Sequence, residues 1–198
     1  MTNPEGCEDY RRRIEELERD KAFLEAQVRE LNALQDLGRA VRQEDSVDGL
    51  AQKAVEAVAH GVDAQLAYLF LKRYGSMGLA AFSIRNMDQS LSEQALDDLR
   101  NHDPFQCMCG QAIRQRQPVF SLDLEADDRC VLGHCRRAGI GSLAAMPLVV
   151  GGRSTGVLVL GTAAPRDFSL EQSALESLAS LLAQGLERAI LHEQLVLH

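Results

Sequence analysis

The sequence contains no tryptophan, and aromatic residues account for only 5% of its 198 residues. With so few rings, a platform that stacks nucleobases or sugars is not favoured. Long apolar runs are missing as well, since none approaches the ~20 residues that a membrane-spanning helix needs. The N-terminal segment, MTNPEGCEDY, lacks the basic and then apolar layout of a signal peptide. We therefore expect a cytoplasmic protein with no membrane partner.

Basic residues are also in short supply, because 21 Lys and Arg stand against 29 Asp and Glu and give a formal net charge of -8. Nucleic acids and anionic membranes are bound through patches of Lys and Arg. The one basic cluster, Arg11 to Arg13, is followed directly by Glu15 and Glu16. This alternation is typical of one face of a charged helix, so we expect no nucleic-acid partner.

Cysteine is the residue type that the chain concentrates in one place. Four of its five cysteines lie between residues 107 and 135 in the pattern C-x-C-G…C-x4-C, and Cys7 stands apart in a polar N-terminal segment. In a reducing compartment structural disulfides are rare, so clustered cysteines favour metal or redox chemistry. We assign both cofactor binding and metal binding to this set: Cys107, Cys109, Cys130 and Cys135.

Four thiolates suit either a tetrahedral zinc site or an iron–sulfur cluster. Neither spacing is the C-x2-C knuckle of structural zinc sites, so an iron–sulfur cluster is the favoured cofactor and zinc the alternative. Arginines flank the second pair and would lower the thiol pKa values and offset the charge of a cluster; they are Arg129, Arg136 and Arg137. Two other interpretations stay open: a reversible disulfide without metal, and thiols that only fill a small-ligand pocket.

Histidine and aspartate side chains near the cysteines have plainer interpretations. His102 and His134 are nearby in sequence, and His134 is able to replace a cysteine as ligand. A lone histidine on a polar helix is more often solvated. Asp127 and Asp128 resemble the acidic start of a helix, where negative charge matches the helix dipole, and we assign no catalytic residue.

The N-terminal part predicts one long helix from about Glu8 to Val41. Apolar residues alternate in steps of three and four, which is the seam of a coiled coil, and the pattern shifts by one position from Leu34 onward. We therefore expect a parallel homodimer, with a single amphipathic helix lying on its own domain as the alternative. The seam positions are Ile14, Leu17, Lys21, Leu24, Val28 and Leu31.

The rest of the chain predicts short helices and strands in alternation. Ser46 or Asp45 is expected to cap the second helix, Gly151 and Gly152 to turn a hairpin, and Ser169 with Gln172 to form a capping box for the last helix. This order is typical of an α+β protein with a central antiparallel sheet and helices on one face. The predicted helices are 44–62, 92–102, 109–118, 127–139 and 169–195, and the strands are 65–74, 78–84, 119–123, 142–150 and 153–163.

From about Ser46 to Arg188 the sequence resembles a GAF domain, a small-molecule sensor module of signalling proteins. The residues that carry the resemblance are CGQAIRQRQPVFSLDLEAD, the G-x-x-S-x-x-x-x-P-L stretch in GIGSLAAMPLV, the hairpin GGRSTGVLVLGT and the closing helix. The resemblance implies a sheet with the first and last helices on one face and a roofed ligand pocket on the other. The domains are then an N-terminal tail and coiled-coil helix (1–45), a GAF-like sensor domain (46–192), and a C-terminal tail or start of a signalling helix (193–198).

The function that this resemblance implies is a non-enzymatic sensor for redox state or gas, because cysteine sets in GAF domains are associated with iron–sulfur sensing. The expected partners are a second copy, bound through the N-terminal and closing helices, and an output domain such as a histidine kinase, in cis or in trans. One alternative is an enzyme similar to free methionine-(R)-sulfoxide reductase, since Cys109, Gly110 and Cys130 resemble positions of that family, although Cys107 and Cys135 do not. The other is a dimerisation module that binds a small ligand.

Overall fold

A single antiparallel sheet forms the centre of the molecule. The computed structural model describes residues 4–86, 89–131 and 133–196, and the sheet has the strand order β2-β1-β5-β4-β3 with every neighbouring pair antiparallel. This confirms the expected α+β class. The strands are β1 (Leu66–Arg73), β2 (Ser76–Ile84), β3 (Val119–Ser121), β4 (Ser142–Val150) and β5 (Arg153–Thr162).

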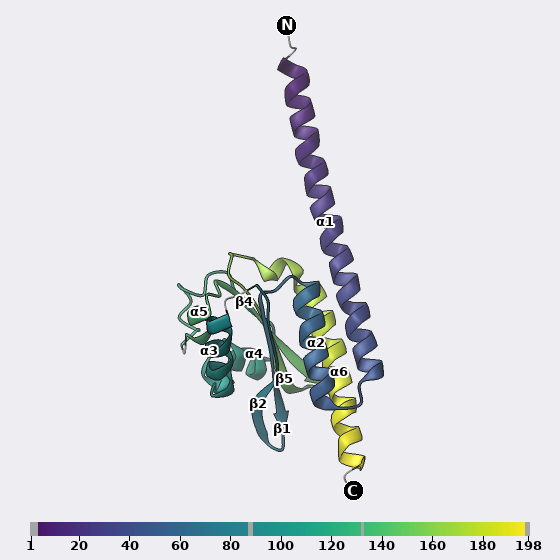
Figure 1. The fold of residues 1–198 in the computed structure, drawn as a ribbon, viewed down its shortest axis with the longest axis vertical. Helices are drawn as coiled ribbons and strands as arrows, with labels where there is room; N and C mark the ends of the chain where they lie inside the picture. The colour runs from purple at the N-terminus through teal and green to yellow at the C-terminus, as the bar shows by residue number, and fades with distance from the viewer. Residues whose placement is uncertain (1–3, 87–88, 132, 197–198) are drawn as a thin grey trace.

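Helices cover both faces of the sheet, and the two layers differ in character (Figure 1). The long helices lie on one face and the short helices on the other, where they form the roof over the sheet. The long helices are α1 (Pro4–Gln43), α2 (Val47–Gly61) and α6 (Gln172–Val196). The short ones are α3 (Gln89–Arg100), α4 (Met108–Gln115) and α5 (His134–Arg137), with the 3-10 turn η1 (Pro104–Gln106). A second 3-10 turn, η2 (Phe168–Glu171), leads into α6, and its Phe168 packs in the core under the long helices.

Strand β1 shows how the sheet serves two cores. Successive side chains of a strand point to opposite faces. In β1 the alternate residues Leu66, Tyr68 and Phe70 belong to the core under the short helices. Leu69 and Leu71 belong to the core under the long helices. Because both faces are covered, the strand is a continuous apolar run rather than an alternating one.

Two local predictions hold because their chemistry is specific. Gly151 and Gly152 have φ values of 55° and 74° and turn between β4 and β5, a backbone conformation that glycine adopts without strain. Ser46 is the N-cap of α2, and its hydroxyl accepts a hydrogen bond of 3.1 Å from the backbone N–H of Gly49.

Several predicted helix boundaries are wrong. The predicted helix 127–139 is reduced to α5, because Gly133 lies in the left-handed region at φ 65° and ends any helix that approaches it. No capping box forms at Ser169, whose backbone N–H and hydroxyl both donate to the carboxylate of Asp167. Asp167 thereby caps η2, and α6 begins only at Gln172. Helix α3 begins before the predicted start at Ser92.

Helix α1 presents two different faces. Ala33, Leu37 and Ala40 are buried in the core with α2 and α6. Ile14 and Leu31 are 55% and 65% exposed, as are the other apolar seam residues to a similar degree. At 3.6 residues per turn the buried set and the seam lie on opposite sides of the helix. The predicted phase shift thus marks where the helix meets the domain. The alternative, a single amphipathic helix that lies on its own domain, is wrong for the N-terminal part of α1, which projects away from the domain (Figure 1).

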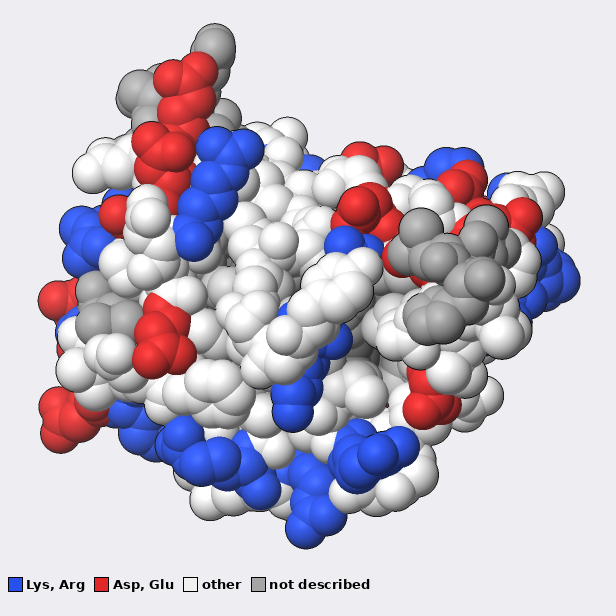
Figure 2. Space-filling model, turned by 90° about the horizontal axis from the view of Figure 1, so that it is seen from below, with Lys and Arg blue, Asp and Glu red and all other residues white. Residues whose placement is uncertain are grey.

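Charge is unevenly distributed at the end of the molecule opposite the projecting helix. Figure 2 shows Lys and Arg side chains gathered along one edge of that end, with uncharged side chains over much of its centre. Among the helices of the described ranges, none has the length and apolar character required to cross a bilayer.

Candidate metal and thiol site

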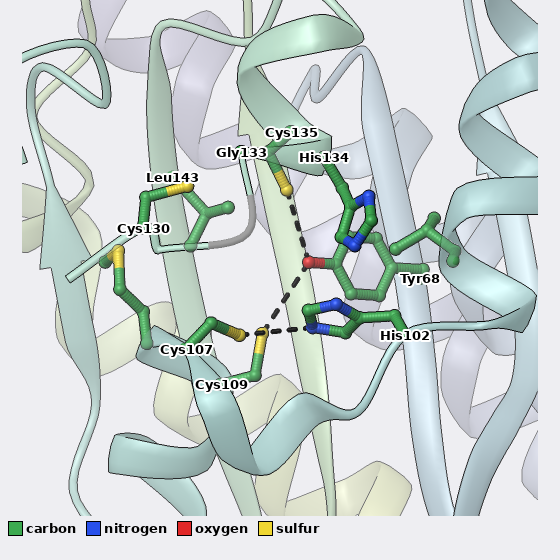
Figure 3. Close-up of a pocket in the computed structure, with 11 residues that line it drawn as sticks. Tyr68, His102, Cys107, Cys109, Cys130, Gly133, His134, Cys135 and Leu143 are labelled. Atoms are coloured by element: carbon green, nitrogen blue, oxygen red, sulfur yellow. Dashed lines mark hydrogen bonds between the residues drawn. The ribbon is translucent and has the colours of Figure 1, made fainter. Parts of the chain in front are cut away.

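A small cavity lies between the sheet and the roof of short helices. Its volume is about 20 Å³, which is room for roughly one water molecule or ion. An organic ligand of the size of an amino acid or a cyclic nucleotide requires a much larger pocket. All four predicted cysteines line the cavity, together with Tyr68, Leu99, His102, Met108, Gly133, His134 and Leu143 (Figure 3).

Cys107 and Cys109 are placed by the junction of η1 and α4. The carboxylate of Asp103 caps η1 by accepting from the backbone N–H of Phe105 at 3.0 Å. Cys107 is the extended residue between the two short helices, and Cys109 follows in the first turn of α4. A Cβ on Gly110 would lie 2.5 Å from the Cα of Phe105, so the glycine of the C-x-C-G motif lets η1 approach α4 closely.

His102 joins this pair. Its Nε2 lies 3.2 Å from the Sγ of Cys107. The ligand atoms of His102, Cys107 and Cys109 all lie within 4.8 Å of one another, which makes them a group able to hold one metal ion. The sequence offered a signal for His102 in its H-x4-C-x-C spacing, but the prediction considered only His134 as a substitute ligand and preferred a solvated side chain for it.

Tyr68 connects the two cysteine segments. It stands on β1, and its hydroxyl lies 3.6 Å from the Sγ of Cys109 and 3.4 Å from the Sγ of Cys135 (Figure 3). Sequence reasoning missed Tyr68, because the sheet register that brings it beneath the roof leaves no local spacing pattern.

Cys130 and Cys135 come from the loop before α5 and from α5 itself. Both are buried, and the guanidinium of Arg136 donates a hydrogen bond of 2.5 Å to the backbone carbonyl of Cys130. Cys130 is therefore held by a loop, where the prediction had it on a helix. Cys107, Cys109, Cys130 and Cys135 are all free thiols, and their role as cofactor ligands stays a prediction.

Two of the flanking arginines bind carboxylates. Arg129 donates to Asp127 at 2.6 Å, and Arg137 donates to Asp98 at 2.8 Å. Asp127 therefore acts as the partner of an arginine and not as the acidic start of a helix. The hydrogen bonds from Arg129 lower the pKa of Asp127 strongly, even though its burial opposes the shift.

His134 has a structural partner and is not simply solvated. Its Nδ1 lies 3.1 Å from Asp98 on α3. Its ring meets the ring of His102 edge-on, with centroids 5.0 Å apart. Together with the pair between Arg137 and Asp98, this contact fastens α5 to α3 beside the cavity.

The four thiols differ in acidity. Hydrogen bonds from the Cys109 thiol and then from His102 hold the pKa of Cys107 well below its ordinary value. The same contact with Cys107, followed by burial, raises the pKa of Cys109. Burial raises the pKa of Cys130 and raises that of Cys135 to about 12. Cys107 is thus the thiolate of the set, and the others need a bound cation to ionise at neutral pH.

The donor set fits a soft metal. Thiolate sulfur and imidazole nitrogen are the ligands that zinc and iron–sulfur centres use in proteins. Cys107 and Cys109 lie below the hydroxyl of Tyr68 in Figure 3, and Cys130 and Cys135 lie above it. Among the described residues, His102, Cys107 and Cys109 have ligand atoms close enough together for one ion, and Cys130 and Cys135 line the same cavity from its other side.

Comparison with known proteins agrees with this architecture. No curated protein matches the chain in sequence. The GAF domain of a phosphoenolpyruvate-protein phosphotransferase from Coxiella burnetii superposes with a TM-score of 0.67 at 15% identity, covering 84% of this chain and 98% of that one. Free methionine-R-sulfoxide reductase from Neisseria meningitidis, solved with its substrate, gives 0.66 at 18% identity, covering 82% and 90%. The nlh2 GAF domain from A. aeolicus, solved in an inactive state, gives 0.66 at 11% identity, covering 82% and 98%.

These structural likenesses show the fold. The family is shown by the sequence model of the GAF domain, which matches residues 44–187, nearly the range over which the resemblance was expected. The chain therefore belongs to the GAF domain family.

Proposed function

We propose that this GAF domain is a non-enzymatic sensor in signal transduction, and that its cysteine site holds an iron–sulfur cluster that responds to redox state or a gas. The observation that carries the proposal is the cavity: four thiols from two separate segments surround a space of about 20 Å³. Four cysteine sulfurs around one cavity are the number of ligands that an iron–sulfur cluster uses.

The ligands would be Cys107, Cys109, Cys130 and Cys135, two from each side of the cavity. When bound, the cluster would supply reversible one-electron chemistry or a reactive iron. The protein holds the sulfurs in place and keeps bulk water away, since three of the four thiols are buried.

Zinc is the second candidate, and one observation favours it. His102, Cys107 and Cys109 are close enough together to share a single ion, and zinc commonly takes mixed cysteine and histidine ligands. A zinc centre has no redox activity of its own, so metal analysis separates the two candidates.

The reductase alternative is supported by Cys109, Gly110 and Cys130, which resemble positions of that family. Likeness in fold to free methionine-R-sulfoxide reductases stands at 17–18% identity and carries only the fold.

Output would pass through the helices on the opposite face of the sheet. Strand β1 carries Tyr68 toward the site and Leu69 toward the long helices, so a shift at the sulfurs acts directly on the strand that supports α2. The exposed seam of α1 supports a parallel homodimer with α6 alongside. An output domain such as a histidine kinase, in cis or in trans, would respond to the arrangement of these helices. The alternative function, a dimerisation module, requires no structural change at the cysteine site.

The test is anaerobic purification of the full chain, followed by absorption spectroscopy and analysis of iron, sulfide and zinc. The proposal predicts a brown protein that bleaches in air. Replacing any of the four site cysteines by serine should lower the iron content, whereas the matched control Cys7→Ser should leave it unchanged.

A colourless preparation without iron or sulfide after reconstitution would exclude the cluster. Stoichiometric zinc in place of iron would identify a structural metal site. Reduction of free methionine sulfoxide that depends on Cys109 would instead establish the enzyme.

A further inference from the structure

The hydroxyl of Tyr68 occupies a fixed position at the centre of the cysteine site. Tyr68 is 1% exposed, and its ring stands edge-on to that of Phe70, with centroids 5.7 Å apart and an interplanar angle of 86°. The strand and the packed rings therefore hold the phenol oxygen between the two cysteine segments.

The partners of this hydroxyl are unusual for a buried tyrosine. Within the described ranges, its hydrogen-bond partners are the Sγ atoms of Cys109 and Cys135. A neutral thiol is a weak hydrogen-bonding group, so two thiols satisfy a buried phenol poorly. A thiolate satisfies it well, since hydrogen bonds to a charged acceptor are roughly twice as strong as neutral ones.

The two sulfurs lie 3.6 Å and 3.4 Å from the hydroxyl, below and above it in Figure 3. A bound metal is the agent that deprotonates such thiols. The Tyr68 donor is therefore placed where only a metal-bound sulfur makes full use of it.

We propose that Tyr68 donates a hydrogen bond to a metal-bound sulfur, that of Cys109 or of Cys135, and thereby sets the reduction potential of the centre without holding the metal itself. This inference rests on the proposed function. A hydrogen bond to a ligand sulfur withdraws electron density from it and favours the reduced state of the centre. The hydroxyl lies between the α4 and α5 segments, so Tyr68 acts on the centre by positioning a proton and not as a ligand.

The direct test compares Tyr68→Phe with the wild-type chain and with a matched control, Tyr74→Phe. Tyr74 lies at the turn after β1 and is 91% exposed, so it undergoes the same chemical change away from sulfur. Iron and sulfide content, thermal stability and the reduction potential would be measured on each protein after anaerobic reconstitution. We expect equal iron content in all three, with a more negative potential only in Tyr68→Phe.

Two outcomes of that experiment would overturn the inference about Tyr68. One is an unchanged potential in Tyr68→Phe, and the other is loss of iron from a Tyr68→Phe protein that is still folded, which would make Tyr68 a holding residue. If the proposed function itself is wrong, the result differs, because the wild-type protein then takes up no iron.

A second arm addresses Tyr68 whichever metal is resident. Co²⁺ added to the metal-free chain gives a sulfur-to-cobalt charge-transfer band whose energy reports hydrogen bonding to the ligand sulfurs. The inference predicts that Tyr68→Phe shifts this band and Tyr74→Phe does not. Identical bands in all three proteins, or failure of the wild-type protein to bind Co²⁺, would refute it.

Discussion

The Nε2 atom of His102 lies 3.2 Å from the Sγ of Cys107, and its Nδ1 atom is buried without a hydrogen-bond partner among the described residues. The contact places a nitrogen donor beside the one half-buried thiol of the site. After the hydrogen bond from Cys109, it is the next cause of the lowered pKa of Cys107. His102 is therefore the side chain through which the reactivity of Cys107 can be altered from outside the cysteine set.

Replacing His102 by alanine should slow alkylation of Cys107 in metal-free protein at neutral pH. The pKa of Cys107 would rise once the nitrogen is gone, so less thiolate would be present, and thiolate is the form that reacts. Between pH 6 and 8 the wild-type rate with iodoacetamide should be nearly flat, and the His102→Ala rate should climb with pH. Mass spectrometry of the modified peptide gives both rates.

The matched control for this experiment is His192→Ala, which removes an exposed histidine from α6. It should leave the rate of Cys107 alkylation unchanged. A flat pH profile in both histidine variants would show that Cys109 alone lowers the pKa of Cys107.

Substitution of Gly110 by alanine should disturb the site through the backbone. The new Cβ would lie 2.5 Å from the Cα of Phe105, and strain of this kind costs about 1–3 kcal/mol. Chemical denaturation should show the loss of stability, and metal uptake should fall because Cys107 and Cys109 flank the displaced turn. Gly78→Ala, where a Cβ meets no atom within 4 Å, should have little effect on either quantity. Equal stability of the two variants would contradict the close approach of η1 to α4.

The sequence predicted those features that depend on local spacing or on period. The Gly151-Gly152 turn, the apolar strands around it and the closing helix follow from the pattern of the chain alone. The C-x-C-G and C-x4-C spacing likewise brought attention to the cysteines that line the cavity.

Features that depend on tertiary contacts were beyond such patterns. Tyr68 meets Cys109 and Cys135 because β1 lies under both α4 and α5, and residues so far apart leave no spacing to recognise. The helix predicted around Cys130 failed for a local reason, since Gly133 in the left-handed region divides the segment. Asp167 and not Ser169 caps the turn before the last helix, because the Asp167 carboxylate accepts hydrogen bonds from both the backbone N–H and the hydroxyl of Ser169.

The contacts of Asp98 on α3 with His134 and Arg137 on α5 should make a pH-dependent contribution to the free energy of unfolding. Burial alone would raise the pKa of Asp98, but hydrogen bonds from Arg137 and His134 outweigh it and lower that pKa. A lowered pKa means that the carboxylate stabilises the fold above its ordinary value of 3.8 and that this contribution is lost as pH falls through the folded value.

Asp98→Asn should therefore reduce the free energy of unfolding by about 0.2–1 kcal/mol at pH 7, the range of partly exposed ion pairs. The difference from wild type should shrink as the pH falls below the ordinary pKa of the carboxyl. Urea denaturation at several pH values measures this, with Asp97→Asn as the control, because Asp97 is an exposed neighbour that pairs with Arg100 across one helical turn. A deficit that stays constant down to acid pH would show that the charge of Asp98 is not its cause.

The two faces of α1 allow the proposed dimerisation to be tested separately from folding by single substitutions. Leu24 is exposed on the seam, whereas Leu37 is fully buried against the domain. Deleting the chain up to Val41 would remove both features at once, so point changes are the sharper test.

Leu24→Glu should place a charge in the seam and convert a dimer to a monomer in sedimentation, with little change in the unfolding of the domain. Leu37→Ala should do the reverse, costing about 2–5 kcal/mol of stability through the cavity it leaves while the seam remains intact. The control Glu25→Gln lies beside the seam and should affect neither property. If Leu24→Glu remains a dimer, then the interface lies elsewhere, and the exposed leucines Leu191 and Leu195 at the end of α6 are the next surface to alter. If Leu24→Glu changes only the dimer mass and Leu37→Ala changes only the domain stability, then one face of the helix serves association and the other serves folding.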